Sequence, residues 1–141
     1  MSIQAVTHAV NVRREGRTVV ILDQTLLPNR TEYLTLSEPG ELWEAIHALR
    51  IRGAPAIGIF AAYSMAVLAA GIDAPDFDGF YREYRRLSDY LNSSRPTAVN
   101  LSHMLRRMDG VVLAHRDAPR AALLAALDRE AAAIHQEDMD M

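Results

Sequence analysis

The sequence IRGAPAIGIFAAYSMAVLAAG, residues 51–71, decides the fold class of this chain. Its second part, Ile57 to Ala70, is apolar around almost the whole circumference of a helix, which is typical of a helix buried on every side. Gly71 follows as a natural C-terminal stop. The stretch therefore predicts a buried helix of a soluble domain. It is too short and too broken to span a membrane, because four residues interrupt it: Pro55, Gly58, Tyr63 and Ser64.

The segment before this helix predicts short strands. Thr7 to Arg13 alternates weakly between polar and apolar residues, and Glu15-Gly16 supplies turn chemistry. Thr18 to Leu22 is a β-branched run, and Tyr33 to Leu36 is a third candidate strand. Consecutive short strands with tight connections favour an antiparallel meander.

Further helices are predicted from capping residues and apolar stripes. Ser37 is expected to cap a helix with Pro39 in its first turn, Asp76 a second helix, and Thr97 a third. The fold class is therefore α+β, a small antiparallel β-meander followed by a helical bundle. Each helix has apolar residues at helical spacing: Leu42, Trp43, Ile46 and Leu49; Phe77, Phe80, Tyr81, Tyr84, Leu87 and Leu91; Leu101, Met104, Leu105 and Met108.

The last predicted helix starts at Pro119 and has an unusual end. Glu137, Asp138 and Asp140 cluster where the helix dipole disfavours acids, by about 0.3–1 kcal/mol each. Two interpretations are open: the end frays, or the helix is designed to continue.

Composition excludes several kinds of chemistry. The chain has 141 residues and a net charge of -3, which argues against a dedicated nucleic-acid binder. It has no cysteine, so disulfides and thiol nucleophiles are excluded, and it has no lysine for a Schiff base or a Walker-type loop. The N-terminus lacks the pattern of a signal peptide, and the cytoplasm is the expected location. A small anionic ligand remains compatible with this composition.

Two arginine-containing segments are candidates for binding an anion. In the first loop, residues 51–54, Arg52 and Gly53 precede a helix whose free N–H groups suit a phosphate. The alternative is a tight helix–helix connection in which Gly53 and Ala54 allow close packing. In the second loop, residues 93–97, Arg95 precedes another helix, and the alternative is an ordinary surface cap. The two loops could converge on one anion.

Other polar residues have simpler interpretations. Asp23 follows a strand, where a carboxylate could be catalytic or could serve a turn or cap. Arg82, Arg85 and Arg86 are expected on a solvated or partner-facing side of their helix. The histidines do not pair at metal-ligand spacing and are taken as surface or satisfied core groups: His8, His47, His103, His115 and His135.

Three motifs together resemble the methylthioribose-1-phosphate isomerase family, which shares a superfamily with the regulatory subunits of translation initiation factor 2B. They are Leu22-Asp-Gln-Thr-Leu-Leu-Pro28, Ile51-Arg-Gly-Ala-Pro-Ala-Ile-Gly58 and Arg95-Pro-Thr-Ala-Val-Asn-Leu101. The resemblance implies an N-terminal α+β domain, expected at 1–118, and a connecting helix that starts at 119–141. The family's larger Rossmann-like domain would follow, and this chain resembles only the first part.

The resemblance also implies a reaction, an aldose–ketose isomerisation of methylthioribose 1-phosphate in methionine salvage. The family's acid/base Asp and its Cys lie in the second domain, so no catalytic residue is expected in this chain. Arg52, Gly53, Ala54 and Arg95 match the family's substrate contacts. The resemblance implies no metal or organic cofactor, no nucleic-acid or membrane partner, and a homodimer for the complete enzyme.

Two other functions remain open. The chain could be a non-enzymatic regulatory or binding module of the initiation factor 2B type, as the superfamily link indicates. It could also be one half of a split enzyme whose second chain supplies the missing Cys and Asp.

Overall fold

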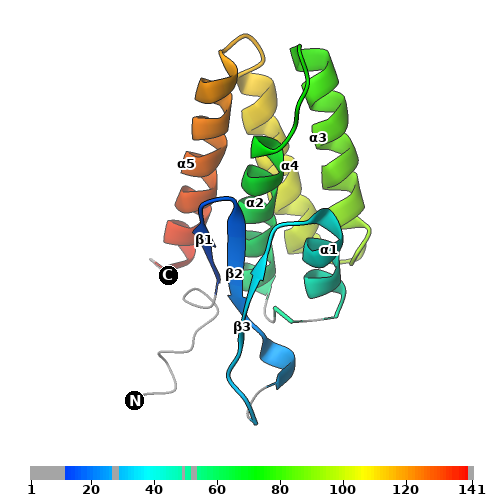
Figure 1. The fold of residues 1–141 in the computed structure, drawn as a ribbon, viewed down its shortest axis with the longest axis vertical. Helices are drawn as coiled ribbons and strands as arrows, with labels where there is room; N and C mark the ends of the chain where they lie inside the picture. Colours follow the sequence, from blue (N-terminus) through cyan, green and yellow to red (C-terminus); the bar gives the residue numbers. More distant parts are fainter. Residues whose placement is uncertain (1–11, 27–28, 49, 52–53, 140–141) are drawn as a thin grey trace.

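The N-terminal part forms a three-stranded antiparallel sheet (Figure 1). The computed structural model describes residues 12–26, 29–48, 50–51 and 54–139. The strands β1 (Val12–Glu15), β2 (Thr18–Leu22) and β3 (Tyr33–Leu36) lie in the order β1-β2-β3, and a 3-10 helix, η3 (Gln24–Leu26), follows β2. The predicted meander is confirmed, with β2 and β3 at their predicted bounds. The predicted strand 7–13 lies mostly outside the described residues, and β1 runs on to Glu15, where Gly16 turns the chain with a φ of 60°.

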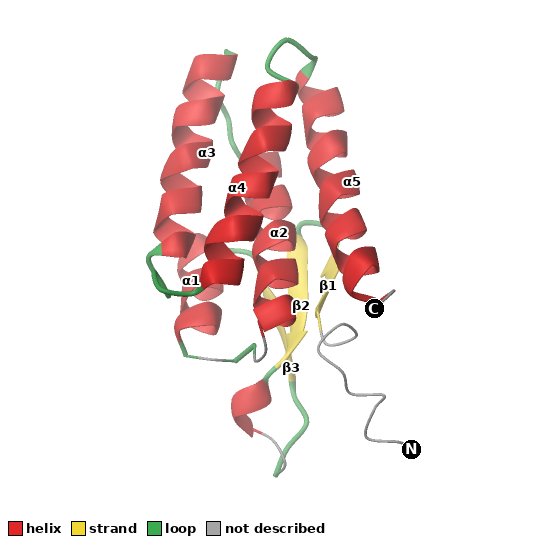
Figure 2. Ribbon diagram, turned by 180° about the vertical axis from the view of Figure 1, so that it is seen from behind, coloured by secondary structure: helices red, strands yellow, loops and turns green. Residues whose placement is uncertain are grey.

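In the part of the chain that the structure describes, five α-helices follow the sheet: α1 (Pro39–His47), α2 (Ala54–Ala70), α3 (Phe77–Asn92), α4 (Val99–Ala114) and α5 (Arg120–Met139). In Figure 1, α2 and α4 run upward while α3 and α5 run downward. Figure 2 shows the same bundle from behind, with the sheet against it. Within the described part of the chain, no helix is long and apolar enough to cross a bilayer.

Helix α2 is the centre of the core, as predicted. It contacts the sheet strands β1 and β2 and all four other helices. Phe60, Ala61 and Met65 are fully buried, and strand residues Val19 and Ile21 belong to the same apolar cluster. The predicted stripes of α3 and α4 also join this cluster, whereas Leu49 lies outside the described residues.

Two predicted caps are wrong and one is confirmed. Helix α1 is capped by Glu38, not Ser37, because the Glu41 carboxylate accepts the backbone N–H groups of both residues at 3.1 Å. Ala98, not Thr97, precedes α4 and offers no side-chain cap. Asp76 caps α3 as predicted and accepts the Gly79 N–H at 2.8 Å.

The acidic end of α5 is compensated from another helix. Arg107 of α4 donates Nη1 and Nη2 to the two carboxylate oxygens of Glu137, at 2.9 and 2.6 Å, and its Nε to Glu130 at 2.5 Å. The bonds to these carboxylates raise the pKa of Arg107 further above its ordinary range, and the Arg107 bonds lower the pKa of Glu137. The repulsion expected from the dipole is thus offset by Arg107, while the domain boundary at 118/119 stays a prediction.

Helices α2 and α4 approach closely at Gly58. A Cβ atom on Gly58 would lie 2.9 Å from Cγ of Met104 and 3.8 Å from the Asn100 carbonyl oxygen. Gly58 is one turn into α2 and Asn100 is in the first turn of α4, so this contact brings the starts of the two helices together. Close helix packing thus occurs at Gly58, while the packing alternative at Gly53 and Ala54 lies outside the described side chains.

We predict that Gly58→Val lowers the free energy of unfolding by about 1–3 kcal/mol, because the added atoms force Met104 and the helices apart. Gly110→Val is the matched control, since Gly110 lies in α4 and an added Cβ there meets nothing within 4 Å. The control should change stability by less than about 0.5 kcal/mol. Urea unfolding of the chain measures both, and equal effects would contradict the close-packing argument.

Candidate functional site

The two predicted anion loops lie at the same end of the bundle. Arg52 and Gly53 are outside the described residues, but Ala54 begins α2 and Arg95 lies in the loop before α4. The contact of Gly58 with Met104 and Asn100 brings these helix starts side by side. Figures 1 and 2 both show the starts of α2 and α4 at the end of the bundle that also holds α1. The structure thus places the starts of α2 and α4 at one end of the bundle, and the convergence of the two loops on one anion stays a prediction.

Two helix N-termini, those of α2 and α4, lie at this end of the bundle. Each helix N-terminus carries the equivalent of about half a positive charge and exposes backbone N–H groups. No side chain caps the start of α4, because Ala98 is at the cap position. Arg95 is half-buried, and its guanidinium has no hydrogen-bond or ion-pair partner among the described residues. An anion placed here would meet N–H donors from the backbone and a free guanidinium.

The second loop is held in place by α1. Trp43 Nε1 donates to Ser93 Oγ at 3.0 Å, and His47 Nδ1 donates to the Ser94 carbonyl oxygen at 3.2 Å. The Trp43 ring stacks on His47 with centroids 4.6 Å apart, and on Tyr90 at 6.1 Å. Arg95 therefore follows directly after two residues whose positions α1 fixes.

Asp23 has a structural role in the turn after β2, as the cap alternative predicted. Its side chain is only 3% exposed, and its Oδ1 accepts the N–H and O–H of Thr25 at 3.0 and 2.6 Å. Its Oδ2 accepts Nη1 of Arg50 at 2.7 Å. Burial alone raises the pKa of Asp23, but the Thr25 and Arg50 hydrogen bonds and the Arg50 charge outweigh it, so the pKa lies below its ordinary value.

Three residues of this region were missed by the sequence interpretation: Trp43 and His47 as contacts of the second loop, and Arg50 as the partner of Asp23. The sequence places Trp43 only in an apolar stripe, and its half-buried ring does pack against the core. The spacing of Asp23 and Thr25 signals a local side-chain turn. Nothing local signals Arg50, which is 27 residues from Asp23.

Comparison with known proteins fits this geometry. The model of the initiation factor 2 subunit family matches residues 50–141, which includes α2, α4 and both loops.

The chain belongs to the initiation factor 2 subunit family.

Three known proteins resemble the chain over most of its length. The methylthioribose-1-phosphate isomerase of Symbiobacterium thermophilum is 53% identical over 123 residues, 87% of this chain and 34% of that protein. The crystal structure of 5-methylthioribose 1-phosphate isomerase from Pyrococcus horikoshii aligns with a TM-score of 0.86 and 31% identity, over 90% of this chain and 36% of that one. Translation initiation factor eIF-2B subunit delta from A. fulgidus aligns with a TM-score of 0.83 and 30% identity, over 92% and 37%.

The family resemblance and the fold class predicted from the sequence are both confirmed by these matches. Two of these three relatives are named as isomerases, so the family includes enzymes. The chain spans about a third of their length.

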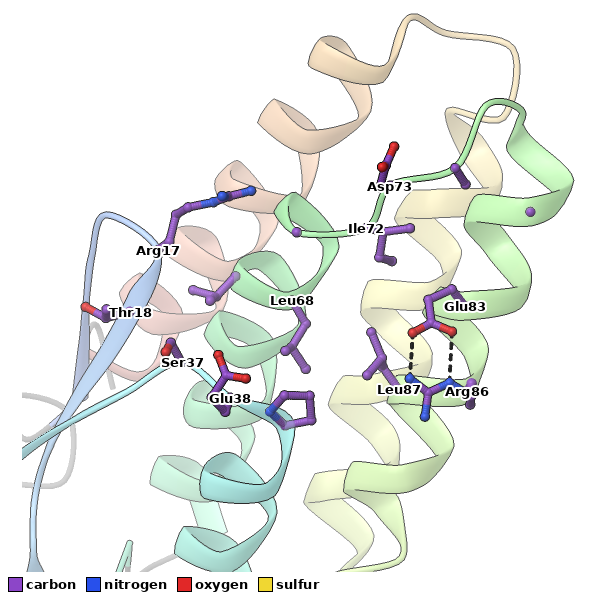
Figure 3. Close-up of a pocket in the computed structure, with 15 residues that line it drawn as sticks. Arg17, Thr18, Ser37, Glu38, Leu68, Ile72, Asp73, Glu83, Arg86 and Leu87 are labelled. Atoms are coloured by element: carbon purple, nitrogen blue, oxygen red, sulfur yellow. Dashed lines mark hydrogen bonds and ion pairs between the residues drawn. The ribbon is translucent and has the colours of Figure 1, made fainter.

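One groove of this family member lies away from the helix starts of α2 and α4. Its volume is about 680 Å³, and it lies between the sheet, the start of α1, the later part of α2 and α3 (Figure 3). Neither Ala54 nor Arg95 lines it. Both arginines of the groove already donate hydrogen bonds within the protein, Arg86 to Glu83 and Arg17 to the Ala70 carbonyl oxygen. The groove is therefore a weaker candidate for binding an anion.

We predict that the Trp43–Ser93 hydrogen bond contributes about 0.5–1.5 kcal/mol to stability. A double-mutant cycle of Trp43→Phe and Ser93→Ala measures this coupling, because Phe keeps an aromatic ring toward His47 and Tyr90 while it removes the N–H donor. Additive effects of the two substitutions would mean that the bond does not hold the loop.

We predict a pH dependence for the buried Asp23. Its pKa is lowered in the folded state, so its ionised form stabilises the fold above the unfolded pKa, about 3.9. This contribution is lost as the pH falls through the folded pKa. Asp23→Asn should therefore be less stable than the unsubstituted chain by about 1.5–3 kcal/mol at pH 7. Denaturant unfolding should show this difference shrinking toward pH 2, whereas a constant difference would contradict it.

Proposed function

We propose that this chain supplies the sugar-phosphate-binding part of a methylthioribose-1-phosphate isomerase, which acts in methionine salvage in the cytoplasm. The observation that carries the proposal is the half-buried Arg95, which lacks a partner among the described residues where the starts of α2 and α4 meet. The 53% identity to a methylthioribose-1-phosphate isomerase supports the choice of substrate.

Four residues are proposed to contact the substrate. The guanidinium groups of Arg52 and Arg95 would donate to phosphate or hydroxyl oxygens, and charged, forked donors suit such oxygens. Gly53 and Ala54 would contribute backbone N–H groups beside the positive end of α2. A phosphate dianion is stabilised by each of these groups, and none of them needs to gain or lose a proton.

The reaction requires more than binding. The phosphate is attached to the anomeric oxygen, so the sugar ring cannot open as that of a free sugar does. The enzyme has to assist ring opening and then move hydrogen from C2 to C1. We propose that acid/base groups outside these 141 residues carry those steps, since the relatives are about two and a half times as long. The chain alone is then expected to bind the substrate without turning it over.

A regulatory or binding module of the initiation factor 2B type is the second candidate. The alignment with subunit delta from A. fulgidus, at a TM-score of 0.83, favours it. Specific capture of initiation-factor subunits by the purified chain, without binding of the sugar phosphate, would support this candidate over the enzyme.

We predict that Arg95→Ala weakens binding of methylthioribose 1-phosphate at least tenfold, because a charge-assisted hydrogen bond contributes about 1.5–3 kcal/mol. Isothermal titration calorimetry with the purified chain measures the change. Arg82→Ala is the control for charge, since it also removes one arginine charge, but from an exposed side chain in the second turn of α3, which starts at the opposite end of the bundle. Equal affinities for the two variants would refute the assignment of Arg95.

The same preparation tests whether the chain is sufficient for catalysis. We expect no formation of methylthioribulose 1-phosphate by the chain alone. Robust turnover would contradict the proposal that the acid/base groups lie elsewhere.

A further inference from the structure

The Leu22–Pro28 motif has no role in the proposed contacts, but its Asp23 belongs to a network beside the first loop. Asp23 directs one carboxylate oxygen to Thr25 and the other to Arg50. Its backbone N–H donates to the Glu32 carbonyl oxygen at 2.9 Å, so the residue itself is fixed by the sheet end. The motif thus presents one buried carboxylate oxygen at a fixed position.

Each nitrogen of the Arg50 guanidinium donates at least one hydrogen bond within this network. Its Nε and Nη2 donate to the two oxygens of Glu44 at 2.8 and 3.1 Å, and its Nη1 donates to Asp23 and Thr25 at 2.7 and 3.2 Å. Its backbone N–H donates to the Ala45 carbonyl oxygen at 3.0 Å. Two carboxylates thus balance the charge of Arg50, whereas Arg95 has no carboxylate partner among the described residues.

Arg50 links the network to the first loop, because it lies two residues before Arg52. Arg50 and the buried Ile51 directly precede Arg52 and Gly53, and α2 starts at Ala54. The chain is therefore fixed on one side of the first loop by β2 and α1, through Asp23 and Glu44, and on the other side by the buried helix α2. A short loop fixed on both sides loses less conformational entropy when it binds a ligand.

We infer that Asp23 and Arg50 are positioning residues. They hold the chain directly before Arg52 and so orient the proposed substrate contacts of the first loop, but they do not contact the substrate themselves. This inference rests on the proposed function and adds to it a role for the Leu22–Pro28 motif. The ion pair with the buried Asp23 holds Arg50, two positions before Arg52, whereas Glu44, whose side chain is 50% exposed, orients Arg50 from the solvent side.

A purely electrostatic role and a positioning role of Asp23 predict opposite effects of Asp23→Asn on ligand binding. Asp23→Asn and Glu44→Gln each remove one negative charge beside Arg50. If the network acted only through charge, both would strengthen the binding of an anion. If Asp23 positions the loop, Asp23→Asn weakens binding of methylthioribose 1-phosphate about tenfold or more, because small displacements of binding groups are costly. Glu44→Gln should then bind within about twofold of the unsubstituted chain, since the buried pair remains.

Calorimetry on the 141-residue chain distinguishes these outcomes. Stronger binding by both variants, or equal binding by both, would overturn the inference. Arg95→Ala in the same series separates the two proposals. If Arg95→Ala leaves binding unchanged, the proposed function fails; if it weakens binding while Asp23→Asn matches Glu44→Gln, only the positioning role fails.

Hydrogen–deuterium exchange tests the same role without a ligand. The amides of residues 51–57 should exchange faster in Asp23→Asn than in Glu44→Gln, while those in the middle of α4 stay unchanged in both. Should Asp23→Asn not fold, Thr25→Val replaces it, because Thr25 is exposed and its hydroxyl contacts both Asp23 and Arg50. Unchanged exchange at residues 51–57 in the variant that folds would overturn the inference.

Discussion

A helix that is apolar around its whole circumference has to be covered from every direction, and α2 is such a helix. Strands β1 and β2 cover one side of it, and the other four helices contact the remaining sides. Because α2 and α4 run the same way, their starts meet at one end of the bundle, and Gly58 lets them approach closely. The starts of α2 and α4 therefore lie at the same end as a consequence of how the core is buried.

Helix α1 relates the two loops to each other. Although it is only 9 residues long, it holds Arg50 through Glu44, and it contacts Ser93 and Ser94 through Trp43 and His47. Residues four apart, such as Trp43 and His47, lie on one face of a helix, whereas adjacent residues such as Trp43 and Glu44 diverge. Trp43 and His47 accordingly serve the second loop, while Glu44 points to the first.

Local features of the fold were predictable from the sequence, and those that depend on distant partners were not. The β-branched run gave the bounds of β2, and the apolar run identified α2. The caps at Ser37 and Thr97 were wrong, because Glu41 reaches back past the expected residue and α4 starts without a side-chain cap. The ion pair of Asp23 with Arg50 joins elements 27 residues apart, which no local pattern specifies. The substrate contacts of Arg52, Gly53, Ala54 and Arg95 stay predictions.

The contrast between paired and unpaired arginines is the strongest electrostatic argument for the location of the site. Arg50 and Arg107 each donate to two carboxylates, and Arg14 pairs with Asp128 across the sheet and α5. The chain has 18 acidic residues for 15 arginines, so a lack of carboxylates does not explain the state of Arg95. A half-buried guanidinium has lost part of its hydration, and no carboxylate in the described part of the chain offsets that loss for Arg95. An arriving phosphate would offset it, because the negative charge arrives only with the ligand, and the attraction then appears in the binding free energy instead of in the stability of the fold.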